Sequence, residues 1–151
     1  MKKVICLVGI GLLFVSMVMI GCATVQKTII TKSNLPTLIG KWEGWTTFGS
    51  VETLSVMTTL EIYNDTIPVQ GKITLIHLPD SVAFAFPADA KTAGDNAIIN
   101  FPNGMISDQG TLIIQSGQDF LEFTLFVGEK IKMNGRFYYY GFRGTMHLTK
   151  K

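Results

Sequence analysis

From Leu38 onward, apolar and polar residues alternate with a period of two, and this alternation constrains the fold more than any other feature of the chain. It is clearest in the runs Leu54–Tyr63, Val69–Ile76, Leu121–Val127, Lys130–Tyr139 and Phe142–Thr149. Successive side chains of a β-strand point to opposite faces, so each run predicts a strand with one apolar face and one wetted face. Such strands are typical of antiparallel sheets. No stretch after Cys22 shows sustained helical periodicity.

Turn-forming residues separate these runs at short intervals. Asn, Asp, Gly, Pro and Ser gather at residues 64–65, 79–80, 94–96, 102–104, 107–110, 116–119 and 128–129. Further strands are expected at 38–45, 81–86 and 96–101, with residues 87–95 as a longer loop. About eight or nine strands joined by short links predict an all-β fold, either an antiparallel up-and-down β-barrel or a β-sandwich. Closure into a barrel is favoured because it leaves no unpaired edge.

Residues 1–22 have the organisation of a secretory signal. Lys2 and Lys3 precede an apolar run from Val4 to Ile20, and Gly21 is a small residue at the expected cleavage point. The segment Met19-Ile20-Gly21-Cys22 resembles the lipobox of bacterial lipoproteins. That resemblance implies a cleaved signal peptide, a mature chain that begins at Cys22, and fatty acyl chains such as palmitate attached to this cysteine. A membrane-spanning helix that is never cut is the alternative, since the run is barely long enough to cross about 30 Å of hydrocarbon.

These features predict three parts of the chain. Residues 1–21 form the lipoprotein signal peptide, residues 22–36 a lipid-anchored tether, and residues 37–151 an antiparallel β domain. An extra edge strand at residues 25–31 is the alternative to a plain tether. Removing residues 1–21 from 151 leaves 130 residues, the size of one ordinary domain. Ala23 follows the cysteine where Asp would otherwise retain a lipoprotein, so by the same resemblance the outer membrane is favoured over the inner membrane of the cell envelope.

Charge and cysteine content exclude several classes of function. Loss of Lys2 and Lys3 lowers the number of cations from 13 to 11, which equals the 11 acidic residues. A mature chain without net charge or a basic cluster does not have the composition of a nucleic-acid-binding protein. Cys6 lies in the discarded run and Cys22 is the lipid site, so the predicted domain has neither a disulfide nor a cysteine nucleophile.

Candidate catalytic and metal-binding residues do not form a recognisable constellation. His77 and His147 fall on separate strands, without the local pairing expected of zinc ligands. No Gly-x-Ser-x-Gly motif marks a serine hydrolase. The carboxylates occupy predicted outward positions or turns, namely Glu43, Glu52, Glu61, Glu122, Glu129, Asp65, Asp80, Asp95, Asp108 and Asp119. We therefore expect a protein that is not an enzyme and has no metal or other cofactor.

The predicted interior suggests a binding role. The segment Gly40-Lys41-Trp42 resembles the Gly-x-Trp start of lipocalin-like barrels, in which the tryptophan closes one end, and Gly144-Thr145-x-x-Leu148 resembles the last strand of many small exported β domains. The resemblance implies a barrel that often binds an apolar ligand, although Trp42 also fits an ordinary core position. The inward phase adds aromatic and sulfur side chains, which gives a candidate ligand cavity of Trp42, Phe123, Met133, Phe137 and Tyr139.

The opposite phase of the same strand suggests a contact surface. Arg136, Tyr138 and Tyr140 are expected to point outward, where adjacent tyrosines beside an arginine suit a partner, a sugar or a lipid headgroup. Two hypotheses follow for a membrane-anchored envelope lipoprotein. In the first, a non-enzymatic barrel binds a small apolar ligand or lipid. In the second, a barrel with a filled core serves as a structural or interaction module that docks to another envelope protein.

Overall fold

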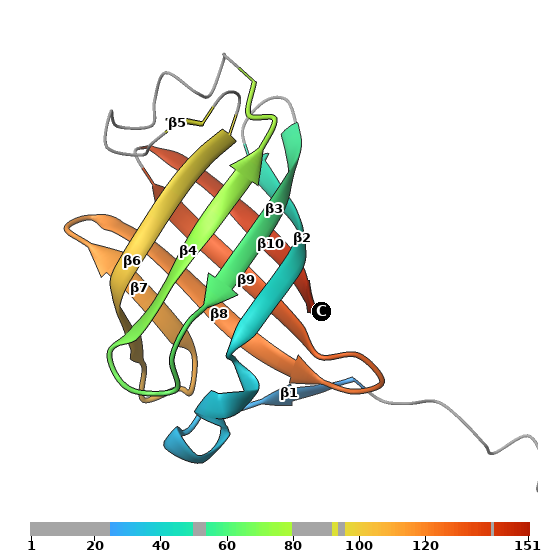
Figure 1. Ribbon diagram of the computed structural model, residues 1–151, viewed down its shortest axis with the longest axis vertical. Helices are drawn as coiled ribbons and strands as arrows, with labels where there is room; N and C mark the ends of the chain where they lie inside the picture. The colour runs from blue at the N-terminus through green and yellow to red at the C-terminus, as the bar shows by residue number, and fades with distance from the viewer. Residues whose placement is uncertain (1–24, 50–53, 80–91, 94–95, 140) are drawn as a thin grey trace, which may run out of the picture.

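The computed structural model describes residues 25–49, 54–79, 92–93, 96–139 and 141–151, which form an antiparallel β-barrel with a short 3-10 helix at one end (Figure 1). In chain order the elements are β1 (Gln26–Thr28), η1 (Lys32–Thr37), β2 (Gly40–Gly49), β3 (Leu54–Ile62), β4 (Val69–Ile76), β5 (Thr92–Ala93), β6 (Asn96–Ile106), β7 (Leu112–Ser116), β8 (Asp119–Val127), β9 (Lys132–Tyr139) and β10 (Phe142–Lys150). The predicted signal peptide, Cys22 and the strand predicted at 81–86 lie outside the described residues. Within the described ranges, no helix is both long enough and apolar enough to cross a bilayer.

Successive strands pair with one another, so the topology is up-and-down. The pairs run from β2 through β3, β4, β6, β7, β8 and β9 to β10, and all are antiparallel. β10 then pairs with β2, from Arg143 opposite Gly49 to Lys150 opposite Trp42. Among the described residues, eight strands therefore form a closed wall, which confirms the predicted barrel and excludes the sandwich. Closure gives each of these strands a neighbour on both sides.

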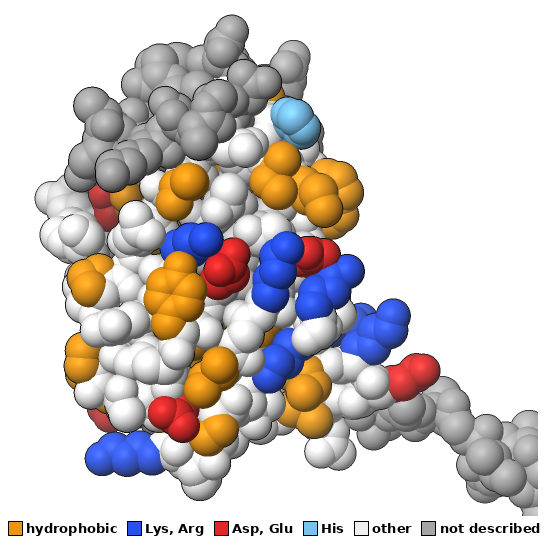
Figure 2. Space-filling model, viewed as in Figure 1, with side chains coloured by type: hydrophobic (Ala, Val, Ile, Leu, Met, Phe, Trp, Pro, Cys, Tyr) orange, Lys and Arg blue, Asp and Glu red, His pale blue; other side chains and the backbone are white. Residues whose placement is uncertain are grey.

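The alternation in the sequence corresponds to the two faces of this wall. On β3 and β9, for example, Val56, Leu60, Met133 and Phe137 are buried in the barrel. The outer face carries ion pairs, including Lys72 with Glu61 at 3.3 Å. Figure 2 shows charged side chains of both signs across the middle of the visible wall, with hydrophobic side chains above and below them. The inward apolar residues of all the barrel strands form one core, which supplies the main driving force for folding.

The segment before the barrel is ordered and closes one of its ends. Ile30, Leu35 and Leu38 are buried in the core cluster. The turn that carries them is held by Asn34, whose Oδ1 accepts a hydrogen bond from the Thr31 amide at 2.8 Å and whose Nδ2 donates to the Ile29 carbonyl at 2.9 Å. The apolar side chains of η1 and its flanks thus plug the barrel end.

β1 pairs with β8 where β7 does not reach. β7 pairs with the first part of β8, from Asp119 to Phe123, and β1 pairs with the last part, from Leu125 to Val127. The extra edge strand that the sequence left open is therefore present. Among the described residues, the expected boundary at Pro36 does not separate a tether from the barrel, because β1 and η1 both pack on it.

A second correction concerns residues 102–104, which were expected to form a turn. β6 instead continues through them to Ile106. The pairing register with β4 shifts there, because Gly71 faces Phe101 while Val69 faces Gly104. A bulge of this kind tolerates Pro102, which has no amide proton to donate to a neighbouring strand. The Asn103 side chain also donates a hydrogen bond to the Gln115 carbonyl of β7 at 3.1 Å, which stabilises the continuation.

Candidate functional site

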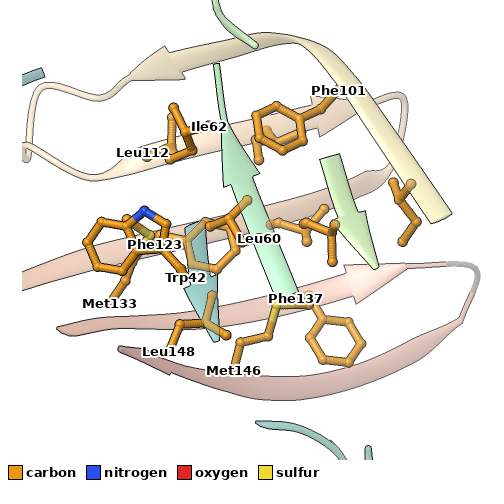
Figure 3. Close-up of a cluster of buried hydrophobic side chains, with 14 of the residues drawn as sticks. Trp42, Leu60, Ile62, Phe101, Leu112, Phe123, Met133, Phe137, Met146 and Leu148 are labelled. Carbon is orange, nitrogen blue, oxygen red and sulfur yellow. The ribbon is translucent and has the colours of Figure 1, made fainter. Parts of the chain in front are cut away.

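Three of the predicted cavity residues are packed in the core, in the half of the barrel next to η1. Trp42, Phe123 and Met133 come from β2, β8 and β9, and none of the three has any exposed surface. Figure 3 shows them together in the buried cluster. Gly135 faces Phe123 across the β8–β9 pair, and a Cβ on this glycine would lie only 2.6 Å from the phenylalanine ring. The absence of a side chain at Gly135 therefore makes room for Phe123 in the packed core.

Trp42 is held by specific contacts at this end. Its indole Nε1 donates a hydrogen bond to the Leu38 carbonyl at 2.8 Å, which joins β2 to the segment after η1. The Lys150 Nζ lies 5.8 Å from the centre of the ring and donates to the Thr37 carbonyl at 2.6 Å. Trp42 thus connects the plug, the first barrel strand and the last one.

The other two predicted cavity residues border a small void in the opposite half of the barrel. The void between the described strands has a volume of about 10 Å³ and is lined by Thr46, Phe48, Leu75, Ile99, Leu121, Phe137, Tyr139 and Met146. Holding a single water molecule takes roughly 10–15 Å³, so this void is smaller than any organic ligand. Phe48 fills much of the space, because its ring meets Phe137 edge-on with centroids 5.4 Å apart and Phe142 with centroids 6.1 Å apart.

The polar groups of the interior satisfy one another. The hydroxyls of Thr46 and Thr58 are both buried and lie 2.6 Å apart, so one donates a hydrogen bond to the other. Thr58 is also within hydrogen-bonding distance, 3.3 Å, of the Val56 carbonyl. Among the described residues, no buried side-chain nitrogen or oxygen lacks a partner. The buried side chains of the described residues therefore present no unpaired polar atom to a ligand.

The outer wall carries an aromatic cluster that the sequence indicated only in part. Tyr138 is on the outer face as expected, and its ring stacks on Phe120 with centroids 6.5 Å apart and planes inclined by 29°. The Arg143 guanidinium lies 5.5 Å from the centre of the Tyr138 ring. Together with Arg136, these residues line a shallow groove of about 420 Å³. We call Phe120, Tyr138 and Arg143 the aromatic platform; Tyr140 lies outside the described residues.

Arg143 of the platform and the neighbouring Arg136 have different partners. Arg136 is paired with Glu122, whose Oε2 lies 2.6 Å from both Nε and Nη2. The other carboxylate oxygen of Glu122 accepts a hydrogen bond from the Thr111 hydroxyl at 3.1 Å. Glu122 is thus occupied in holding Arg136. The guanidinium of Arg143 lies over the Tyr138 ring instead, and no carboxylate partner of it is described.

Phe120 and Arg143 were missed by the sequence analysis although a signal was present. Phe120 pairs with Tyr138 across β8 and β9, and Arg143 pairs with Tyr138 across β10 and β9. The three residues therefore form one row across the wall. Counting outward from the links that join β8 to β9 and β9 to β10 would have placed them in register, because the length of a link fixes which residues face each other.

The two histidine candidates lie apart on the described barrel. His147 lies on the outer face of β10 with Nδ1 at 3.1 Å from the Asn134 side-chain oxygen, and His77 is exposed just after β4. The described part of the chain contains no group of three His, Cys, Asp or Glu side chains that could hold a metal ion. The candidates Glu52, Asp80 and Asp95 lie outside the described residues.

The pKa of Glu43 is shifted by its neighbours. A hydrogen bond from Lys41, and then one from Lys151, lowers its pKa below the usual value. The Lys41 and Lys151 Nζ atoms lie 2.8 and 2.9 Å from its two carboxylate oxygens. Glu43 is therefore kept ionised by its lysine partners, which is the opposite of what a general acid requires.

Comparison with known proteins adds no relative: no family profile, curated protein or solved structure matches the chain.

Proposed function

We propose that this chain is a bacterial envelope lipoprotein whose barrel binds another envelope protein through its outer wall. The observation that carries the docking role is the contrast between the two faces of the wall. The void between the described strands measures about 10 Å³, whereas the groove beside the aromatic platform measures about 420 Å³. The barrel is not an enzyme in this proposal, and it needs no cofactor.

The proposed anchor rests on the sequence. The lipobox-like segment Met19-Ile20-Gly21-Cys22 ends at the one cysteine that would remain in the mature chain. A single acyl chain binds a membrane only marginally, whereas two or more hold a protein there stably. A triacylated Cys22 would therefore keep the barrel permanently at the envelope membrane, with the outer membrane favoured by Ala23.

The aromatic platform has the composition of a protein-binding surface. Tyrosine, phenylalanine and arginine are enriched in the cores of protein interfaces, and tyrosine and arginine are among the residues that dominate their binding energy. Arg143 adds a positive charge beside the rings, so the expected partner presents a carboxylate next to an apolar or aromatic side chain. A double substitution of Tyr138 and Arg143 removes both features together.

A photo-crosslinking experiment tests the docking role. With a photoreactive phenylalanine analogue at Phe120, we expect a discrete crosslinked partner in intact cells. Adding Tyr138→Ser with Arg143→Ser should lower its yield by about tenfold or more, as expected for the centre of an interface. The same analogue at Met105, an exposed residue of β6, is the matched control and should give no such product. Equal crosslinking from Phe120 and Met105 would contradict the assignment of this face.

The apolar-ligand hypothesis remains as a second candidate because Phe137 and Tyr139 do border the one apolar void described above. It requires that the void expand when a ligand enters. The docking proposal predicts instead that the chain from Ala23 shows no saturable binding of an apolar fluorophore.

Met133→Trp distinguishes the two candidates further. Because Met133 is fully buried and does not line the void described above, a larger side chain overpacks the core and should cost about 1–3 kcal/mol of stability. Denaturant unfolding measures this change, and Lys72→Gln on the outer wall serves as the control with little effect. Saturable fluorophore binding that Met133→Trp weakens, without loss of stability, would favour the ligand hypothesis instead.

A further inference from the structure

The end of the barrel that carries β1 and η1 has a surface suited to a bilayer. The described chain begins at Val25, which packs beside Gly128 in the turn between β8 and β9. Only three peptide steps separate Val25 from Cys22, so the anchor lies within about 10 Å of this end in a fully extended chain. This step rests on the proposed membrane anchor. It means that β1, η1 and the neighbouring turns are the parts of the barrel held closest to the membrane.

Apolar side chains project from this same end. Val25 and Ile29 are 50% and 61% exposed, and Ile67 and Val127 are more than a third exposed. Val127 pairs with Gln26 of β1, and Ile29 lies against Gly110 in the turn between β6 and β7. Ile67 shares a shallow groove with Lys32 and Leu35 of η1. Contacts with β1 and η1 thus place all of these side chains at the plugged end.

Lysines surround the apolar side chains. Across β1, β8 and β9, Phe126 pairs with Lys27 on one side and with Lys132 on the other. Next to this row is a groove of about 670 Å³ lined by Glu43, Glu129, Lys130, Ile131, Lys132, Thr149, Lys150 and Lys151. Figure 2 shows basic, acidic and hydrophobic side chains interspersed at this end of the molecule.

Acidic side chains at the same end do not cancel this charge. Glu43 is already paired with Lys41 and Lys151. The remaining acids are Glu129, Asp65 and Asp108, against Lys27, Lys32, Lys130, Lys132 and Lys150. Basic residues beside exposed apolar ones are typical of surfaces that rest in the headgroup region of anionic membranes.

We infer that the plugged end of the barrel is a membrane-contact surface that binds the anionic headgroups of the bilayer to which the chain is anchored. Val25, Ile29 and Val127 enter the headgroup region. Lys27, Lys130 and Lys132 contact the lipid phosphates. The barrel therefore stands on the bilayer with its plugged end down, and the hairpin between β7 and β8 points away from it.

Depth-dependent fluorescence quenching tests this orientation. The full-length chain is reconstituted into vesicles containing phosphatidylglycerol and brominated phospholipids, with tryptophan introduced by Val127→Trp or by Ser116→Trp. Ser116 is the matched control because it is exposed and pairs with Asp119 at the opposite end of β8. Above the background of Trp42 and Trp45, quenching at position 127 should exceed quenching at position 116 by roughly threefold. Ile29→Trp provides a second reporter if Val127→Trp fails to fold.

The charge requirement is tested in the same vesicles. Replacing phosphatidylglycerol with phosphatidylcholine, or combining Lys27→Gln with Lys130→Gln and Lys132→Gln, should reduce the difference between the two positions by about half or more. Lys72→Gln removes a lysine from the middle of the wall, where it is paired with Glu61, and should leave the difference intact. Equal quenching at positions 127 and 116, or quenching that ignores lipid charge, overturns the inference.

The result of the quenching experiment can be distinguished from a failure of the proposed lipidation. An apolar segment that is never cut would also bring Val25 to the bilayer surface, so the quenching experiment reports orientation with either anchor. The mass of the purified chain reports independently whether residues 1–21 have been removed and acyl chains added at Cys22.

Discussion

Replacing Cys22 with alanine is expected to abolish incorporation of an alkyne-tagged fatty acid into the chain. The thioether and amide positions that would carry acyl chains both belong to residue 22, and no other cysteine follows it. The substitution should also block removal of residues 1–21, because the predicted cleavage site requires this cysteine. Labelling of growing cells followed by gel fluorescence measures the first effect, and the slower migration of the uncut chain measures the second.

Cys6→Ala is the matched control for this experiment. Cys6 lies within the apolar run that the predicted cleavage discards, so its replacement should leave both labelling and cleavage unchanged. If Cys22→Ala is still labelled, or if Cys6→Ala loses the label, the lipobox interpretation is wrong. The barrel would then remain as described, but its place in the envelope would have no support.

Trp42→Ala is expected to produce the largest loss of stability among substitutions in the barrel. Removing a fully buried tryptophan leaves a cavity and typically costs about 3–5 kcal/mol. It also leaves the Leu38 carbonyl without the indole donor at 2.8 Å. For a domain of this size, the combined loss should lower the melting temperature by roughly 10–20 °C. Thermal unfolding followed by circular dichroism measures the change.

The same strand provides a control that separates burial from residue type. Trp45 lies on the outer face of β2 and is 56% exposed, so Trp45→Ala should change stability by less than about 1 kcal/mol. Trp42→Phe should fall between the two, because it keeps most of the apolar volume but loses the hydrogen bond. Similar melting temperatures for Trp42→Ala and Trp45→Ala would show that Trp42 does not have the structural role assigned to it.

The period-two pattern predicted strands of the wall because each has one face in the core and one in water, but it left both a barrel and a sandwich open. Val56 and Leu60, for instance, could be assigned to the interior from their spacing alone, and both are buried. The pattern could not predict β1. A strand of three residues has no alternation to recognise, and it forms because β8 extends beyond β7 and leaves residues 125–127 to be paired.

The alternation predicted which side of the wall the candidate residues face, but not which side chains contact one another. Alternation correctly predicted that Tyr138 lies on the outer face. The contacts of Phe120 and Arg143 with its ring depend on the register between three strands. Alternation also sent Met133 inward without indicating how much space remains there. Whether an eight-stranded barrel is filled or hollow depends on the summed volumes of all inward side chains, and here Trp42 and Phe123 occupy the space.

The pairing of β1 with the end of β8 determines how the barrel would respond to mechanical load. Force applied along the chain from an anchor at Cys22 acts first on three paired residues, which can separate one after another. The next resistance is the removal of Ile30, Leu35 and Leu38 from the core, a step that exposes buried apolar surface. Once both have yielded, residues 25–37 would add roughly 40 Å of extended chain, enough to lift the barrel clear of the membrane while its closed wall stays intact.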